Sequence, residues 1–177
     1  MYQQCTEAEV QAIAAATNYE QLRDIALSQL ARMDKTLWAT PAIKYVTQIG
    51  IVCGPISNGG VGKGNVAINM KVFAAAVTHF VQQQDGFFFS QVPFEDKIKE
   101  LKQPDVIALG KPVANQKLLD VFYAPLFASG LIKKMQFLPD WPTSDGARWE
   151  RQRGEQLGIT IHDIPMRIAE AFLAAAD

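Results

Sequence analysis

The stretch that most constrains the fold is KYVTQIGIVCG, residues 44–54, which is rich in β-branched side chains and almost continuously apolar at its end. Such a run is typical of a strand buried on both faces of a parallel sheet, because a strand with one wet face alternates apolar and polar residues. Parallel strands need long crossover connections, which are usually helices. We therefore expect an α/β protein in which strands and helices alternate.

The rest of the chain repeats this alternation. After a helix predicted over 65–83, the strand-like segments are FFFSQV (87–92), DVIAL (105–109), MQFLP (135–139) and ITI (159–161). Helical spacing or helix-start residues predict the intervening helices, at 96–102, at 115–130 with a kink at Pro125, from Asp145, and after Pro165. Strands separated by helices in this way predict a doubly wound parallel sheet, with ligands bound at the carboxyl ends of its strands.

The first forty residues follow a different pattern, because they are helical without an intervening strand. Thr6 and Glu9 form a capping-box pattern before an alanine-rich helix that extends to about residue 16. A second helical stretch covers 19–33, and Pro41 interrupts the pattern. We expect an N-terminal helical extension over 1–40, which packs against the α/β domain of residues 41–177 or against a second subunit.

The composition excludes several classes of partner. With 17 basic and 18 acidic residues, the chain has a net charge of −1, which does not favour binding to nucleic acid or to an anionic membrane. No apolar run approaches the roughly 20 residues of a membrane span, and the N-terminus lacks the pattern of a secretory signal. Cys5 and Cys53 have no spacing typical of a disulfide framework or a zinc site. These features predict a cytoplasmic protein without a bound metal, acting on a small molecule or a protein partner.

A glycine-rich loop, GPISNGGVGKGN (54–65), follows the first predicted strand and precedes a helix. Free backbone N–H groups and the helix dipole can hold an anion at such a place. A P-loop is excluded, because Ser57 stands where its first glycine belongs and Gly64 stands where Ser or Thr is needed. A dinucleotide-binding pattern could use Gly62, Gly64 and Ala67, but the next strand ends without the expected acid. An anion or sugar-phosphate site and a purely structural turn both remain open.

The segment LPDWPTSDGARWE, residues 138–150, places a glutamate one turn into a predicted helix. Ser144 is a candidate N-cap, and Asp145 suits the helix dipole in any protein. Capping does not explain Gly146 and its neighbouring alanine, whose small side chains leave an open surface on the first turn. Glu150 lies one turn beyond Gly146 on the same face, so it is a candidate carboxylate in a ligand cleft. Such a group can act as a nucleophile in glycosidic bond cleavage.

The glycine loop and the 138–150 segment together resemble the nucleoside 2-deoxyribosyltransferase superfamily. The second segment is more similar to an allied bacterial and phage family of unknown function, which has a Leu-Pro-x-Trp-x-x-Ser-x-Gly-Ala-x-x-Glu pattern. In this chain that pattern corresponds to Leu138, Pro139, Trp141, Ser144, Gly146, Ala147 and Glu150. The resemblance covers roughly residues 44–161 and leaves the N-terminal helices outside it.

The resemblance implies a flavodoxin-like sheet, a homo-oligomer, and a site for a nucleoside or nucleotide. A retaining displacement at the anomeric carbon of its sugar needs no metal or organic cofactor. By position, Glu150 matches the glutamate that attacks the anomeric carbon of the deoxyribose. Some candidate substrate-binding residues match positions of the family motifs, and others are expected to lie near Glu150. Together they are Gly54, Ser57, Asn58, Gly59, Gly60, Trp141, Ser144 and Gly146. Among these, Ser144 matches a position that contacts substrate or phosphate, and Trp141 is a candidate to face the base.

Two positions depart from the superfamily pattern. Ile51 stands where a tyrosine is common, and Lys133 stands where an aspartate is common. The sequence therefore leaves two functions open. The first is cleavage or transfer of the N-glycosidic bond of a (deoxy)nucleoside or its monophosphate through Glu150. The second is a non-catalytic nucleotide-binding or protein-interaction module that uses the same cleft.

Overall fold

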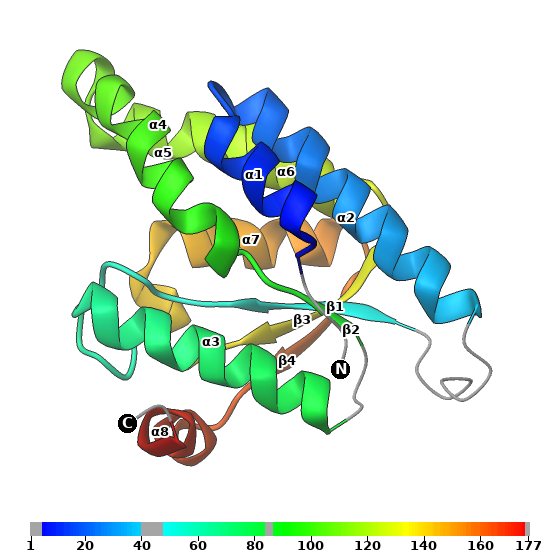
Figure 1. Cartoon of the computed structure of the whole chain (residues 1–177). Helices are drawn as coiled ribbons and strands as arrows, with labels where there is room; N and C mark the ends of the chain where they lie inside the picture. Colours follow the sequence, from blue (N-terminus) through cyan, green and yellow to red (C-terminus); the bar gives the residue numbers. More distant parts are fainter. Residues whose placement is uncertain (1–4, 40–47, 84–86, 176–177) are drawn as a thin grey trace.

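The computed structural model describes residues 5–39, 48–83 and 87–175 and contains a parallel sheet flanked by helices (Figure 1). The four strands are β1 (Ile49–Cys53), β2 (Phe87–Phe89), β3 (Ile132–Phe137) and β4 (Thr160–Asp163). They pair in the order β2-β1-β3-β4, and every pairing is parallel. The predicted α/β class, with a flavodoxin-like doubly wound sheet and N-terminal helices, is confirmed.

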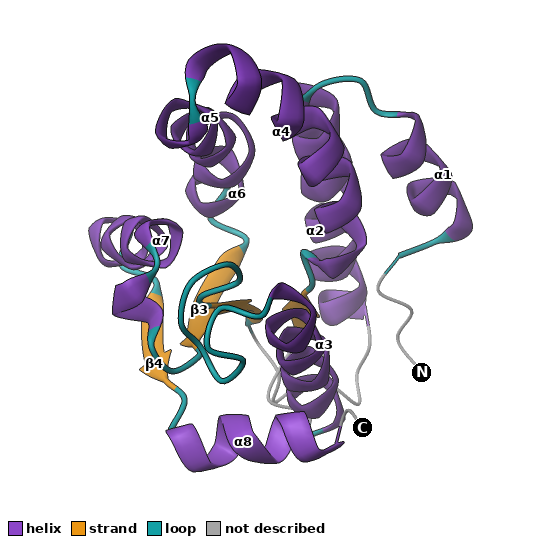
Figure 2. Ribbon diagram, turned by 90° about the vertical axis from the view of Figure 1, so that its left-hand side faces the viewer, coloured by secondary structure: helices purple, strands orange, loops and turns teal. Residues whose placement is uncertain are grey.

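Helices cover both faces of this sheet, as Figure 1 and Figure 2 show from two sides. One face is covered by α3 (Val66–Gln82) and α8 (Met166–Ala175). The other is covered by α2 (Tyr19–Ala39), α6 (Ala124–Ala128) and α7 (Asp145–Gln156). Alternate residues of β1 enter the two cores, since Ile51 belongs to the α2 side and Val52 to the α3 side. All five residues of β1 are buried, as its apolar run predicts.

The N-terminal helices pack against the α/β domain. In α1 (Glu7–Ala15), the predicted capping box between Thr6 and Glu9 is present, and Arg32 of α2 forms an ion pair with Glu9 at 2.8 Å. Apolar residues of α2, such as Leu30, share one core with the strands. The predicted boundary at residues 40 and 41, with Pro41 and the first part of the predicted strand (44–47), lies outside the described residues.

The strand predicted over 105–109 is wrong, because these residues are the end of helix α4 (Glu95–Leu109). The prediction relied on a short apolar run, but Ile107 is 77% exposed, so no sheet buries it. Helix α4 continues through Pro104 and ends at Gly110, whose φ of 85° favours glycine. It packs against α5 (Lys111–Leu118), and Asp105 forms an ion pair with Lys117 at 2.8 Å. Helix pairing here replaces the predicted strand.

The predicted helix around Pro125 begins earlier than expected, at α5, and contains an irregular turn. A π-helical segment, η3 (Leu119–Tyr123), connects α5 to α6 and ends just before Pro125. Proline lacks a backbone N–H group and therefore interrupts the hydrogen bonds of a helix. A π-helical turn, which contains one extra residue, can accommodate such an interruption. The turn also carries Tyr123 into the site described below.

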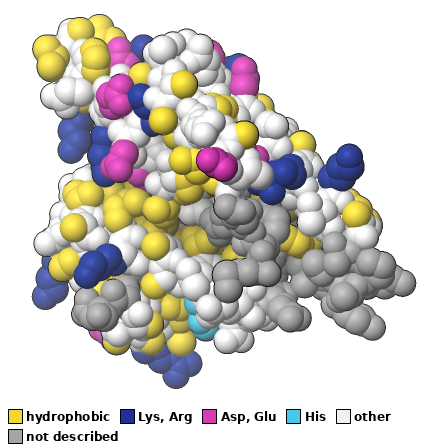
Figure 3. Space-filling model, viewed as in Figure 1, with side chains coloured by type: hydrophobic (Ala, Val, Ile, Leu, Met, Phe, Trp, Pro, Cys, Tyr) yellow, Lys and Arg dark blue, Asp and Glu magenta, His cyan; other side chains and the backbone are white. Residues whose placement is uncertain are grey.

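Charged side chains of both signs are mixed over the face seen in Figure 3, in keeping with the small net charge. Hydrophobic side chains gather at the tip of the α4–α5 pair, where Ile107, Leu109 and Val113 are exposed. Within the described ranges, no helix combines the length and the apolar character that crossing a membrane requires.

Candidate functional site

A pocket of about 590 Å³ opens at the carboxyl ends of the strands. The connection that follows β1 leads to β2 on one side, whereas β3 lies on the other side, so the chain changes direction at β1. Ligands of open α/β sheets bind in the crevice at such a switch point. Gly54 follows β1 and Gln91 follows β2, and both line the pocket with the first turn of α7. The pocket is where the fold class predicts it.

The start of α7 forms one wall of this pocket. The Ser144 hydroxyl accepts a hydrogen bond from the backbone N–H of Ala147 at 3.3 Å, which confirms the predicted N-cap. Gly146 lines the pocket, and a methyl group added there would meet only the Ser144 hydroxyl, at 3.8 Å. Packing therefore does not require glycine at this position, and the open surface that it leaves faces the pocket.

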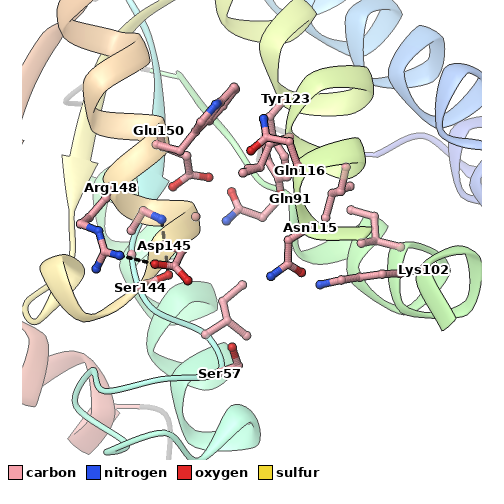
Figure 4. A pocket seen from close by; sticks show the side chains of 18 of the residues that line it. Ser57, Gln91, Lys102, Asn115, Gln116, Tyr123, Ser144, Asp145, Arg148 and Glu150 are labelled. Atoms are coloured by element: carbon pink, nitrogen blue, oxygen red, sulfur yellow. Dashed lines mark hydrogen bonds and ion pairs between the residues drawn. The ribbon is translucent and has the colours of Figure 1, made fainter. Parts of the chain in front are cut away.

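Glu150 lies one turn beyond Gly146 and points from α7 into the pocket (Figure 4). Its side chain is only 7% exposed, and burial raises its pKa to about 8. A hydrogen bond with the buried thiol of Cys53 lowers this pKa, whereas the nearby charge of Glu95 raises it further. Glu150 is therefore mostly protonated at neutral pH in the unliganded protein.

Glu95 is a second buried carboxyl group in the same pocket, in the first turn of α4. It is also 7% exposed, and burial raises its pKa to about 7. The positive charges of Lys99 and Lys102 on the same helix oppose this rise. Tyr123 of η3 also lines the pocket, and burial and the two glutamates keep the pKa of its phenol well above the usual value. It therefore stays protonated and able to donate a hydrogen bond.

The second wall of the pocket consists of α4 and α5. Residues 95, 98, 99 and 102 of α4 line it at helical spacing. Asn115 and Gln116 of α5 also line it. Gln91 lies between the walls and is 4% exposed. Among the described residues, no three His, Cys, Asp or Glu side chains gather in a way that could hold a metal ion. The pocket thus combines two carboxyl groups, a phenol, amides and lysines.

The glycine-rich loop is only partly in the pocket. Gly54 and Ser57 line it, whereas Asn58, Gly59 and Gly60 are not among the lining residues. Gly59 and Gly60 have positive φ angles, which glycine adopts at little cost. The buried side chain of Asn69 holds the loop, donating to the carbonyls of Ile56 and Gly59 and accepting from Gly62 N–H at 2.9 Å. These two glycines therefore shape a turn, whereas Gly54 and Ser57 border the pocket.

Trp141 does not line the pocket either. The guanidinium of Arg151 lies 4.3 Å from the centre of one of its rings, and Phe137 packs edge-on against it. Arg151 is held in turn by two hydrogen bonds to the carboxylate of Asp163, the last residue of β4. Trp141 thus joins the start of α7 to the end of the sheet, a packing role that differs from the predicted contact with a base.

The pocket residues that the sequence did not reveal include the polar and charged Gln91, Glu95, Lys99, Lys102, Asn115, Gln116 and Tyr123. One sequence feature could have indicated Glu95. It follows the second predicted strand closely, and the carboxyl ends of parallel strands meet at one edge of the sheet. The residues of α5 and η3 had no such indication, because their position depends on how α4 and α5 pair.

Comparisons of the chain with protein-family models, with curated proteins and with solved structures give no match. What the pocket can do therefore has to follow from its own residues.

Proposed function

We propose that the protein cleaves or transfers the N-glycosidic bond of a (deoxy)nucleoside or nucleoside monophosphate, with Glu150 as the nucleophile. The observation that carries this proposal is a buried glutamate that points into a 590 Å³ pocket from a helix start lined by Ser144 and Gly146. That volume lies in the range of small-molecule sites. The loop residues Gly54 and Ser57 border the same pocket, so the two motifs that carry the resemblance lie together.

The proposed reaction needs two carboxyl groups. The ionised Glu150 attacks C1′ of the sugar, and the N-glycosidic bond breaks with its electron pair going to the base. The base takes a proton from Glu95, which in its neutral form acts as the general acid. Water or a second base then attacks C1′ and gives its proton to the ionised Glu95, while the bond to Glu150 breaks with its electron pair returning to the carboxylate, giving the free sugar or a new nucleoside. This chemistry needs no metal ion or organic cofactor.

Glu95 and Tyr123 also bear on the two departures from the superfamily pattern. Ile51 is buried in the core below the pocket, and Lys133 is an exposed residue of β3. A carboxyl group and a phenol are nevertheless present in the pocket, contributed by α4 and η3. The absence of tyrosine and aspartate from their usual positions therefore does not remove these groups from the site.

The second candidate function is nucleotide binding without turnover, and the protonation of Glu150 favours it. With a pKa of about 8, only roughly a tenth of Glu150 is ionised at pH 7. A neutral carboxyl group donates a hydrogen bond and is a poor nucleophile. A binding module would use this group to recognise its ligand.

The test is release of free base from a panel of deoxynucleosides, ribonucleosides and their 5′-monophosphates, followed by liquid chromatography. We expect turnover by the wild type and none above background by Glu150→Gln. Glu155→Gln is the matched control, because Glu155 is an exposed carboxylate on the same helix that pairs with Arg151 at 3.4 Å. No base release by the wild type, or equal release by wild type and Glu150→Gln, would contradict catalysis through Glu150.

Thermal denaturation with the same panel separates the two candidate functions. Stabilisation by a nucleoside or nucleotide without release of base would favour the binding module. Turnover without dependence on Glu150 would exclude both, because the first assigns the reaction to this residue and the second allows no turnover.

A further inference from the structure

Lys102 is one of two lysines of the α4 wall that line the pocket. It follows Glu95 by two turns on the same helix face, and its side chain points toward the pocket interior (Figure 4). The neighbouring lysines have acidic partners, since Lys97 pairs with Glu100 at 2.7 Å and Lys99 pairs with Asp96 at 3.3 Å. No ion pair of Lys102 occurs within the described residues.

The surroundings of Lys102 make this lack of a partner costly. The side chain is half-buried, and burial and the charge of Lys111 lower its pKa, whereas the charge of Glu95 offsets this lowering only in part. An ammonium group that is partly removed from water and placed near another cation is destabilised unless an anion comes close to it. A negatively charged ligand group would supply that missing interaction.

Asn115 of α5 provides a second polar group beside Lys102. Its side-chain oxygen is buried and has no hydrogen-bond partner among the described residues, and its amide points into the same part of the pocket (Figure 4). Buried polar atoms of side chains are usually hydrogen-bonded, so an exception inside a pocket is a candidate ligand contact. The Nδ2 group of Asn115 can donate hydrogen bonds to an anionic oxygen, whereas its unpartnered Oδ1 can accept one from a hydroxyl group of the ligand.

The charge of the pocket also favours an anion at this end. Arg148 and Asp145 at the opposite rim form an ion pair with each other, so they add no net charge. The two buried glutamates are wholly or partly protonated at neutral pH. Lys99 is paired with Asp96 in the same way, so among the described residues that line the α4–α5 end the ammonium group of Lys102 is the positive charge without an ion pair.

We propose that Lys102, assisted by Lys99 and Asn115, forms a subsite for the phosphate of the ligand, so that nucleoside 5′-monophosphates are preferred over nucleosides. This inference rests on the proposed function for the identity of the sugar and base. The seven residues from Glu95 to Lys102 correspond to about 10 Å along a helix, which leaves room for a sugar between the carboxyl groups and the phosphate. The resemblance instead implies a phosphate contact at Ser144, on the opposite wall, so the two positions can be told apart.

Calorimetric titration of the full chain tests this subsite without requiring turnover. The probes are 2′-deoxynucleosides, their 5′-monophosphates and inorganic phosphate, and the variants are Lys102→Met, Lys111→Met and Ser144→Ala. Lys111→Met is the matched control, because it removes a neighbouring charge from a residue that does not line the pocket. Circular dichroism checks that each variant is folded.

We expect the wild type to bind a monophosphate about tenfold to hundredfold more tightly than its nucleoside, the range for a hydrogen bond to a charged group. Lys102→Met should lose this preference, whereas Lys111→Met and Ser144→Ala should retain it. Equal affinity of the wild type for nucleoside and monophosphate, loss of the preference only in Ser144→Ala, or no binding of any probe would overturn the subsite. Binding of inorganic phosphate that depends on Lys102, without binding of any nucleoside or nucleotide, would support the subsite and reject the proposed function.

Discussion

The two walls of the pocket each carry a buried glutamate, but they surround it differently. On the α7 wall, Glu150 has a thiol donor, Cys53, and no lysine or arginine that lowers its pKa, which burial raises to about 8. On the α4 wall, Glu95 is followed along the helix by Lys99 and Lys102, and its pKa is raised only to about 7. Both side chains are 7% exposed, and nearby cations offset part of the cost of desolvation on the α4 wall only.

This difference bears on the acid and base roles, and it opposes the proposed assignment, which gives the acid role to the group with the lower pKa. Pairs of carboxyl groups whose surroundings separate their pKa values are typical of acid and base catalysis. Because the charge of Glu95 also raises the pKa of Glu150, the two groups titrate as a coupled pair. The proposed nucleophile is the harder of the two to ionise, so its role is the point on which the proposal depends most.

Substitution of each glutamate in turn should have the largest effect and tests the roles assigned to the two walls. We expect Glu150→Gln to reduce the rate of base release by about 10³-fold or more, since it removes the nucleophile. Glu95→Gln should cost less, about 10²-fold, because general acid catalysis contributes a smaller factor and water can replace it in part. Steady-state rates on the best substrate of the panel give both numbers. A larger loss in Glu95→Gln than in Glu150→Gln would reverse the assigned roles.

The pH dependence of stability tests the same comparison without any substrate. Both carboxyl groups have a folded-state pKa above the ordinary value of 4.5, so the stability gained from their neutral forms is complete below that pH. This stability is lost as the pH rises through about 7 for Glu95 and about 8 for Glu150. Each pKa unit corresponds to about 1.4 kcal/mol, so the loss is larger for Glu150.

Urea denaturation between pH 4 and pH 9 measures this loss. We expect Glu150→Gln to match the wild type near pH 4 and to become more stable than the wild type as the pH rises toward 9. Glu95→Gln should show the same trend with a smaller gain. Parallel curves for wild type and Glu150→Gln would mean that Glu150 is not a buried neutral acid, and they would remove the contrast between the walls.

The α7 wall was largely predictable from the sequence, whereas the α4–α5 wall was not. The cap at Ser144, the open surface at Gly146 and the inward position of Glu150 depend on spacing within a single helix, which a local pattern records. Lys102 and Asn115 come together only because α4 and α5 pair side by side. The prediction of a strand at 105–109 hid that pairing, since it treated a short apolar run as buried when its side chains lie largely on an exposed helix surface.

The sheet itself was easier to predict than its helical cover. The apolar run of β1 requires burial on both faces, and this requirement alone indicates parallel neighbours and crossover helices. The need for glycine at position 50 could not be predicted in this way, because it depends on a side chain of the adjacent strand. A methyl group there would approach the ring of Phe88 to 2.5 Å. Loop residues such as Gly59 and Gly60 were assigned to substrate for a similar reason, since the sequence does not show that Asn69 holds their turn from inside.

The smallest effect concerns two glycines of α7, one facing the pocket and one facing the core. Gly146→Ala should raise the free energy of unfolding by up to about 1 kcal/mol, because alanine favours a helix and the added methyl group has room. Gly154→Ala should not, because its methyl group would lie 2.6 Å from the sulfur of the buried Met135, and overpacking costs about 1–3 kcal/mol. If a ligand approaches the first turn of α7, Gly146→Ala should also weaken its binding despite the gain in stability. Urea denaturation and calorimetry of both variants measure these effects, and unchanged affinity in Gly146→Ala would mean that the ligand contacts only the α4–α5 wall.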